Sequence, residues 1–278
     1  MDLGVLIWLT DQTLTPVQIA REVEQRGYES LWLGDHTHLP VARTTSYPLG
    51  GELAPEYARF IDPFVGLSMA AVATERIKLG CAVCLVAERD PIVLAKEVAT
   101  LDLLSGGRVL LGVGFGWNVE ELDDHGVAFA DRFTVVRERV AAMKALWTQD
   151  IASYQGQFVR LSPSWCWPKP LQRPHPPILI GAAGPTGLKH VVDYGDGWIP
   201  VAGKVGDRIG ELRRLAEQRG RDPDAISISV MSPRPTRKTL EHYREAGVDR
   251  VVLWIPPPGR VDDVRRTLDG WQQLLDHR

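Results

Sequence analysis

The residue types best suited to chemistry stand together in the tetrapeptide Asp35-His36-Thr37-His38, which follows the apolar run Ser30–Gly34. Histidine has an ordinary pKa near neutrality, so an imidazole in a pocket can donate or accept a proton during a reaction. His36 is therefore the predicted catalytic proton donor or orienting group. Asp35 is a predicted anchor for a bound ring or for the backbone. The alternative is that His36 only caps a loop.

Two glycine-rich segments could bring the backbone close to a large ligand. Gly112-Val113-Gly114-Phe115-Gly116 and Gly181-Ala182-Ala183-Gly184 each continue a short apolar run. Without bulky side chains, backbone N–H groups can contact a flat ring or a phosphate, and a helix beginning after Gly184 would add its dipole for an anion. The first segment does not fit the G-x-G-x-x-G fingerprint, and we expect no such helix directly after it. The pattern favours a large cofactor over a sugar or a peptide.

The pair Cys81 and Cys84 has the spacing of a redox-active dithiol. Residues three apart in an extended strand point to opposite faces, so the two thiols should diverge and pack as small buried side chains. Cys166 brings the number of cysteines to three, which does not suit a disulfide-stabilised secreted protein. We therefore expect a reducing, cytoplasmic location.

The elements that must position these residues repeat along the chain as a short apolar run followed by an amphipathic segment. The first helix begins with a capping box at Thr15 and a proline at Pro16, and it ends at Gly27. The expected strands are Leu3–Trp8, Ser30–Gly34, Ile77–Val83, Arg108–Gly114, Ile178–Ile180, Gly197–Val201, Ile226–Met231 and Arg250–Ile255. The expected helices are Thr15–Gly27, Asp62–Thr74, Asp90–Leu104, Phe133–Trp147, Thr186–Tyr194, Val205–Arg219, Thr236–Ala246 and Val261–Leu275.

Continuous apolar strands separated by helices indicate a parallel sheet that is covered on its outside, and eight such units favour closure into a barrel. We therefore predict an α/β fold of the (β/α)₈ TIM-barrel type, as a single domain over residues 1–278. Two excursions should interrupt it. Residues 36–61 follow the second strand, and residues 151–177, with a hairpin around Tyr154–Phe158, follow the fourth helix.

Active sites of such barrels lie at the carboxyl ends of the strands. A metal site built on His36 and His38 would need further ligands at the ends of the fifth, sixth and eighth strands. The residues expected at those ends are Gly181-Ala182, Pro200 and Ile255-Pro256. We therefore predict no catalytic metal. The aromatic residues expected near the barrel mouth, which would wall a dry substrate pocket, are Trp8, Phe115 and Trp117.

The overall composition argues against two classes of partner. With 32 Lys and Arg against 35 Asp and Glu, the chain has no basic surplus for nucleic acid or an anionic membrane. Its apolar runs are interrupted well before the ~18 residues of a membrane span, and Asp2 stands where a signal peptide needs basic residues. We expect a soluble protein with a small-molecule substrate.

Several segments together resemble the bacterial luciferase-like family of flavin- and deazaflavin-dependent oxidoreductases. Three of them read Thr-Glu-Arg-Ile-Lys-Leu-Gly, Ser-Gly-Gly-Arg and Gly-Asp-Gly-Trp, and their separations make the set specific. The matching segments are Leu31–His36, Asp62–Phe64, Thr74–Gly80, Leu104–Arg108, Leu111–Trp117, Pro177–Gly181 and Tyr194–Trp198. The resemblance spans residues 3 to about 201 and implies the same (β/α)₈ barrel.

Within this family the pattern is most similar to members that use coenzyme F420, a 5-deazaflavin that carries hydride. The resemblance implies that Asp35 and His36 lie beside the deazaflavin ring. It places Ala82 and Val83 at a bend of the third strand, where relatives hold a non-prolyl cis peptide against the ring. The further cofactor-binding residues that it implies are Gly114 and Asn118, in and after the glycine run, and the phosphate loop Ala182-Ala183-Gly184-Pro185.

The resemblance also bears on substrate and assembly. Glucose-6-phosphate dehydrogenases of this family have a glutamate and a tryptophan where this chain has Phe115 and Pro40, which argues against a sugar phosphate. A homodimer is implied by the resemblance alone. The predicted function is hydride transfer between F420 and a small, mostly apolar substrate. The alternatives are an FMN-dependent monooxygenase of the same fold and a non-catalytic flavin- or deazaflavin-binding protein.

Overall fold

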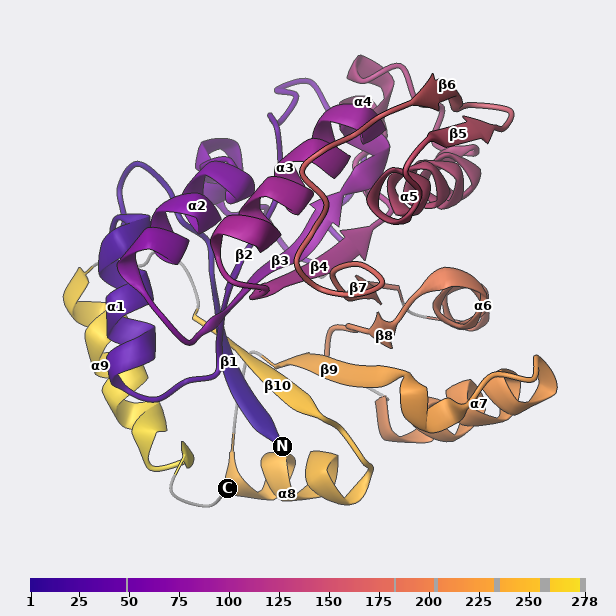
Figure 1. Ribbon diagram of the computed structural model, residues 1–278. Coiled ribbons are helices and arrows are strands. Elements are labelled where there is room, and N and C mark those ends of the chain that lie inside the picture. The colour runs from indigo at the N-terminus through magenta and orange to yellow at the C-terminus, as the bar shows by residue number, and fades with distance from the viewer. Residues whose placement is uncertain (49, 183, 203–204, 233–235, 256–260, 276–278) are drawn as a thin grey trace.

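The centre of the molecule is a closed barrel of parallel strands (Figure 1). The computed structural model describes residues 1–48, 50–182, 184–202, 205–232, 236–255 and 261–275. Around the barrel the order is β1, β2, β3, β4, β7, β8, β9 and β10, and β10 pairs with β1. The bounds are β1 (Asp2–Ile7), β2 (Ser30–Leu33), β3 (Lys78–Leu85), β4 (Val109–Gly114), β7 (Ile178–Ile180), β8 (Gly197–Trp198), β9 (Ser227–Ser232) and β10 (Arg250–Trp254). The predicted (β/α)₈ TIM barrel is confirmed.

Helices surround the barrel (Figure 1). They are α1 (Pro16–Gln25), α2 (Pro63–Ala73), α3 (Pro91–Leu104), α4 (Val119–Asp124), α5 (Arg132–Thr148), α6 (Pro185–Tyr194), α7 (Val205–Gln218), α8 (Arg237–Glu245) and α9 (Val261–Gln272). The predicted capping box at Thr15 is present, and Asp62 and Asp90 each accept two backbone N–H groups at the starts of α2 and α3. Side-chain caps of this kind satisfy N–H groups that have no partner within the helix.

One helix was not expected from the sequence. We predicted no helix directly after the glycine run, and this prediction is wrong because α4 begins at Val119. The side chain of Asn118 accepts hydrogen bonds from the backbone N–H groups of Glu120 and Glu121, which supplies the cap. Helix α4 therefore fixes the position of the acidic residues that follow Asn118.

The core has two layers. Inside the barrel, each strand or the residue after it contributes one buried side chain, and the set is Leu6, Trp32, Ala82, Leu110, Leu179, Ile199, Met231 and Val252. A larger cluster lies between the strands and the helices. Trp32 is fully buried, and a Cβ at Gly80 would lie 2.1 Å from its ring. Glycine at position 80 is thus what admits the indole to the barrel interior.

Both predicted excursions are present. Residues 36–61 contain the short helical turn η1 (Pro55–Arg59), and residues 151–177 contain the antiparallel hairpin of β5 (Ala152–Gln155) and β6 (Arg160–Ser164), which packs beside α5. Two further turns are η2 (Val86–Glu88) and η3 (Pro223–Ala225). Strand β8 is shorter than predicted, because beyond Trp198 the chain pairs with β9 only at the bridge of Val201 with Met231.

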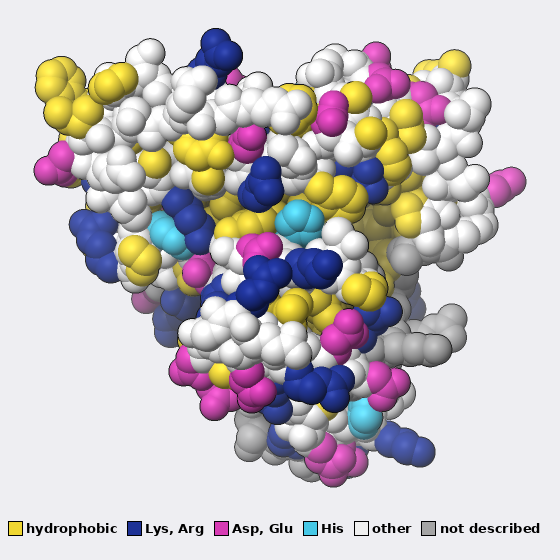
Figure 2. Space-filling view, turned by 90° about the vertical axis from the view of Figure 1, so that its right-hand side faces the viewer, with side chains coloured by type: hydrophobic (Ala, Val, Ile, Leu, Met, Phe, Trp, Pro, Cys, Tyr) yellow, Lys and Arg dark blue, Asp and Glu magenta, His cyan; other side chains and the backbone are white. Residues whose placement is uncertain are grey.

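The surface carries mixed charge. On the face shown in Figure 2, Lys and Arg side chains are interspersed with Asp and Glu, and hydrophobic side chains gather mainly in the upper half. Among the helices that the structure describes, none combines the length and apolar character needed to cross a membrane.

Candidate active site

A pocket of about 310 Å³ opens at the carboxyl ends of the strands. His36, Ala82 and Val83 line it, and its walls are formed by the aromatic side chains of Trp8, Tyr47, Tyr57, Phe60, Trp117 and Trp254. We call this pocket the aromatic chamber. Trp8 and Trp117 thus occupy the predicted position, and the excursion after β2 adds two tyrosines and a phenylalanine that sequence reasoning missed.

The rings of the chamber hold one another in place. The Trp8 ring centroid lies 4.6 Å from that of Tyr57 and 4.8 Å from that of Trp254. The Tyr57 hydroxyl donates to the Tyr47 hydroxyl at 3.0 Å. Burial, followed by the hydrogen bond to Tyr47, raises the pKa of Tyr57 far above its ordinary value. Tyr57 therefore stays neutral, and the chamber wall presents rings and neutral hydroxyls.

The His36 imidazole has a defined orientation. Its Nδ1 lies 2.7 Å from Oε2 of Glu121, and the Trp117 indole N–H lies 3.3 Å from its Nε2. The indole nitrogen can only donate, so Nε2 is the acceptor and Nδ1 carries the hydrogen that is donated to Glu121. We assign the neutral Nδ1–H tautomer from these partners. The Nε2 lone pair is thus engaged by Trp117, a residue of the chamber wall.

Asn118 does not line the aromatic chamber. Its side chain is fully buried and caps α4, and its Nδ2 has no hydrogen-bond partner among the described residues. By capping α4, Asn118 positions Glu121, which is also fully buried. Sequence reasoning missed Glu121, although an asparagine cap followed by acidic residues is a local signal for such a turn.

Asp35 is held by an arginine from the next strand connection. Its Oδ2 accepts from Nε of Arg89 at 2.9 Å and from the Leu85 N–H at 3.0 Å, and its Oδ1 accepts from Nη2 of Arg89 at 2.6 Å. Arg89 also bonds the α2 cap Asp62 at 2.9 Å. Both Asp35 oxygens are therefore used within the protein, which makes Asp35 an anchor for the end of β3.

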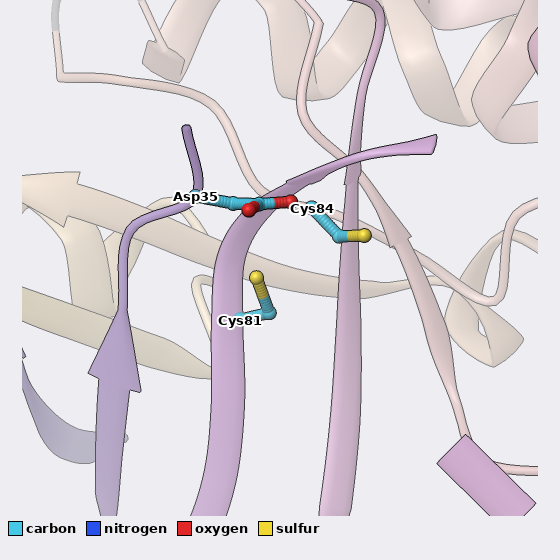
Figure 3. A group of neighbouring side chains, drawn as sticks. All are labelled: Asp35, Cys81 and Cys84. Atoms are coloured by element: carbon cyan, nitrogen blue, oxygen red, sulfur yellow. The ribbon is translucent and has the colours of Figure 1, made fainter. Parts of the chain in front are cut away.

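The two cysteines of β3 lie close to each other and to Asp35 (Figure 3). We predicted that the thiols of Cys81 and Cys84 would diverge, and this prediction is wrong. The pairing of β3 with β4 shifts register between these two residues, so the simple alternation of faces is lost. The Ala82–Val83 peptide bond in this stretch is cis. The two Sγ atoms and an Asp35 oxygen lie within 4.8 Å of one another.

This group is the one set of three possible metal ligands within the described ranges, and it does not include the His36 and His38 pair. Arg89 already forms a bidentate ion pair with the Asp35 carboxylate. Burial raises the pKa of both thiols, which disfavours the thiolate form that binds metal. The geometry therefore favours packing by neutral cysteines.

A second cleft of about 280 Å³ adjoins the chamber and shares Val83, Leu85, Trp117 and Gly181 with it. Gly114, Phe115, Ala182 and Arg132 line only this cleft. Phe115 was predicted to wall the substrate pocket, but its ring packs on Phe133 at 4.7 Å between centroids and lies outside the chamber. The structure thus separates Phe115 from Trp8 and places it with the glycine segments.

Val83 lies between the two spaces, packed against glycines. A Cβ at Gly114 would lie 2.5 Å from Cγ2 of Val83, and a Cβ at Gly181 would lie 2.6 Å from its Cγ1. Any side chain at either glycine would displace Val83. The predicted cofactor residues Gly114, Ala82 and Val83 therefore form one packed unit at the boundary of the two spaces.

The start of α6 borders the cleft. Gly184 precedes the helix with φ +93° and no side-chain cap, Pro185 is its first residue, and Thr186 and Gly187 line the cleft. The predicted residue Ala183 lies outside the described residues. Arg132 lies across the cleft with its Nε buried and without a partner among the described residues, and burial lowers its pKa. A helix N-terminus and a guanidinium there suit an anion.

The barrel, its aromatic chamber at the strand ends and the buried imidazole together define a TIM-barrel enzyme. Residues 14–270 match the family described as luciferase-like monooxygenase. The chain belongs to the luciferase-like monooxygenase family and is an oxidoreductase. The family prediction made from the sequence is confirmed.

Two relatives show the range of similarity. An uncharacterized protein of Mycobacterium tuberculosis is 42% identical over 264 residues, covering 92% of each chain. The F420-dependent glucose-6-phosphate dehydrogenase of Amycolatopsis mediterranei is 32% identical over 243 residues, covering 82% of this chain and 68% of that one. Among solved structures, monooxygenase RslO1 from Streptomyces bottropensis aligns with a TM-score of 0.82 at 19% identity, over 100% of this chain and 99% of that chain. An F420-dependent secondary alcohol dehydrogenase aligns with a TM-score of 0.78 at 18% identity, over 98% and 97%.

Proposed function

We propose that the protein is an F420-dependent oxidoreductase that transfers a hydride between the deazaflavin and a small, mostly apolar substrate. The observation that carries this proposal is the aromatic chamber, which His36 lines and where its Nε2 accepts a hydrogen bond from the wall residue Trp117. Apolar walls exclude water from the reacting atoms, and the imidazole supplies a group that can move one proton. The F420 use named for the relative from Amycolatopsis supports the choice of cofactor.

The residues present fit a large tricyclic cofactor with a phosphate. Val83 and its flanking glycines offer a surface without projecting side chains, and the neighbouring cleft offers the α6 N-terminus and Arg132 for an anion. A Cβ at Gly184 would meet nothing within 4 Å, so the backbone there is open to a ligand. When bound, a deazaflavin supplies or accepts the hydride.

The chain's own residues then perform three tasks. The rings of Trp8, Tyr57 and Trp254 exclude water and contact an apolar substrate. When a substrate hydroxyl displaces the Trp117 indole N–H, Nε2 of His36 accepts the hydroxyl proton as an alcohol is oxidised, or returns it as a carbonyl is reduced. Glu121, at 2.7 Å from Nδ1, balances the charge of the imidazolium that oxidation forms and that reduction consumes.

Titration with the two candidate cofactors tests the proposal. We expect F420 to bind with a lower Kd than FMN, followed by quenching of intrinsic tryptophan fluorescence, because three of the nine tryptophans line the chamber. Tighter binding of FMN, or oxygen-dependent turnover with reduced FMN, would contradict the proposal and favour the monooxygenase. Saturable binding of neither compound would favour a different class of ligand.

The Gly184→Val variant should lose cofactor affinity. Gly184 has φ +93° and ψ 170°, a region that is essentially restricted to glycine, so valine must displace the loop at the α6 N-terminus. We expect the Kd for F420 to rise at least about tenfold, or ~1.4 kcal/mol. The matched control is Gly210→Val on α7, where a Cβ also has open space and the site is remote. Equal affinity in both variants would remove the α6 N-terminus from the cofactor site.

We also propose that the protein is a homodimer that pairs through α2 and α3, which pack side by side (Figure 1). Val72 on α2 is 92% exposed and Leu104 on α3 is 78% exposed, and both line one surface groove together with the exposed Val65 of α2. Apolar surface of this extent is typical of an interface. We expect Val72→Asp to halve the mass measured by light scattering, and the control Val261→Asp on α9 to leave it unchanged. A monomeric wild type would contradict the proposal.

A further inference from the structure

A buried carboxyl group on η2 lies next to Glu121, the partner of His36, and has no role in the function described so far. Glu88 is the last residue of η2 and is 5% exposed. Neither of its oxygens has a hydrogen-bond donor among the described residues. The two arginines nearby are engaged elsewhere, because Arg89 bonds Asp35 and Asp62, and Arg139 donates to the backbone carbonyls of residues 86, 87 and 89.

The group that faces Glu88 is a second buried carboxyl. Helix α4 packs on η2, and the Glu121 carboxyl lies within hydrogen-bonding reach of Glu88. Two carboxylates contain only acceptors, so a hydrogen bond between them exists only when one of them holds a proton. Glu121 already accepts from Nδ1 of His36, whereas Glu88 has no donor. Because Glu121 has a hydrogen-bond donor and Glu88 has none, we assign the shared proton to Glu88.

The surrounding charges agree with this assignment. Burial and then the negative charge of Glu121 raise the pKa of Glu88 to about 9, and Asp35 contributes in the same direction. Arg89 opposes the shift and Arg139 also faces Glu88, but neither forms an ion pair with it. On the other side of Glu121, burial and then the charge of His38 lower the pKa of His125. At neutral pH Glu88 is therefore a carboxylic acid.

We propose that Glu88 is a positioning residue that holds a proton at neutral pH and donates it as a hydrogen bond to Glu121. Glu121 then carries the charge, accepts the Nδ1–H of His36, and keeps Nε2 as the acceptor for Trp117 of the chamber wall. Glu88 thereby sets the pH at which the His36–Glu121 pair takes up a proton, without touching a substrate. This inference rests on the proposed role of His36 for its use in turnover, but it concerns the resting protein.

Infrared spectroscopy of the protein without cofactor or substrate tests the proton on Glu88. A protonated carboxyl has a C=O stretching band that is separate from the bands of carboxylates. We expect the wild type to show such a band at neutral pH and the Glu88→Gln variant to lack it. An unchanged spectrum in this region would show that Glu88 is ionised and would overturn the proposal.

The titration of His36, followed by NMR of its ring, tests the effect on the imidazole. Glutamine keeps a neutral donor to Glu121, so Glu88→Gln should change the pKa of His36 by less than about 0.3 unit. Leucine removes the donor and leaves Glu121 a stronger base, so Glu88→Leu should raise the pKa of His36 by about 0.5 unit or more. If Glu88 were ionised, both variants would remove a negative charge and lower the pKa of His36, which is the opposite sign.

Glu97→Gln is the matched control. Glu97 lies on α3 in the field of the same Arg89, Asp62 and Asp35, and Glu121 is not among the groups that shift its pKa. We expect this variant to leave both the C=O band and the His36 titration as in the wild type. Because the measurements need no cofactor, they can support or overturn the role of Glu88 even if the F420 proposal fails. A His36 titration that is preserved in Glu88→Gln but changed in Glu88→Leu would separate this hydrogen-bonding role from simple packing.

Discussion

Replacement of His36 by alanine is expected to lower turnover about 10²–10⁴-fold, or ~3–5 kcal/mol, while the Kd for the cofactor changes less than about tenfold. A proton donor acts mainly in the transition state, whereas the cofactor would be held by many backbone contacts. Steady-state kinetics with any accepted substrate and a fluorescence titration of the cofactor measure the two effects separately.

Two further variants make the His36 result interpretable. Alanine leaves the buried Glu121 carboxylate without its donor at 2.7 Å, which alone could disturb folding. His36→Asn keeps an N–H near the Nδ1 position but removes the titratable Nε2, and it should lose as much turnover as alanine. The control is His38→Ala, because His38 is exposed and bonds Asp124 on the surface. Near wild-type turnover in both His36 variants would show that His36 only packs in the loop.

Replacement of Arg89 by methionine is expected to reduce the free energy of unfolding by about 3–5 kcal/mol. The Asp35 side chain is fully buried and that of Arg89 is 13% exposed, so the variant would leave a buried carboxylate without its partner. The same change removes a contact to Asp62, which caps α2. Urea denaturation monitored by tryptophan fluorescence measures the loss.

Two further variants serve as controls for Arg89→Met, one at the same ion pair and one at an exposed ion pair. The double variant Asp35→Asn with Arg89→Met should recover part of the loss, because it buries an amide in place of an unpaired charge. Arg59→Met removes an exposed arginine paired with Asp11 and should leave stability close to that of the wild type. A loss in Arg89→Met no larger than in Arg59→Met would show that the Asp35 ion pair is not desolvated.

The sequence by itself determined the repeating strand and helix units of the barrel and the family. The start of a helix can be predicted from a few neighbouring residues. Asp62 and Asp90, each followed by a proline, cap the helix that comes next and need no partner from elsewhere in the chain. The number of strand and helix units then implied a closed barrel. The positions of Trp8, His36 and Trp117 at strand ends followed from that fold, and all three do line the aromatic chamber.

The tertiary structure alone decided which groups face one another. Glu121 lies 85 residues from His36, and Arg89 lies 54 residues from Asp35. The pattern of helices along the sequence does not show that Glu88 and Glu121 lie next to each other, with Glu121 bonded to His36. The register shift in β3 that brings Cys81 toward Cys84 also escaped prediction, because it belongs to the pairing of β3 with β4 and not to β3 itself. Barrel closure sets these contacts, since it makes neighbours of strand ends and loops that have no spacing rule along the chain.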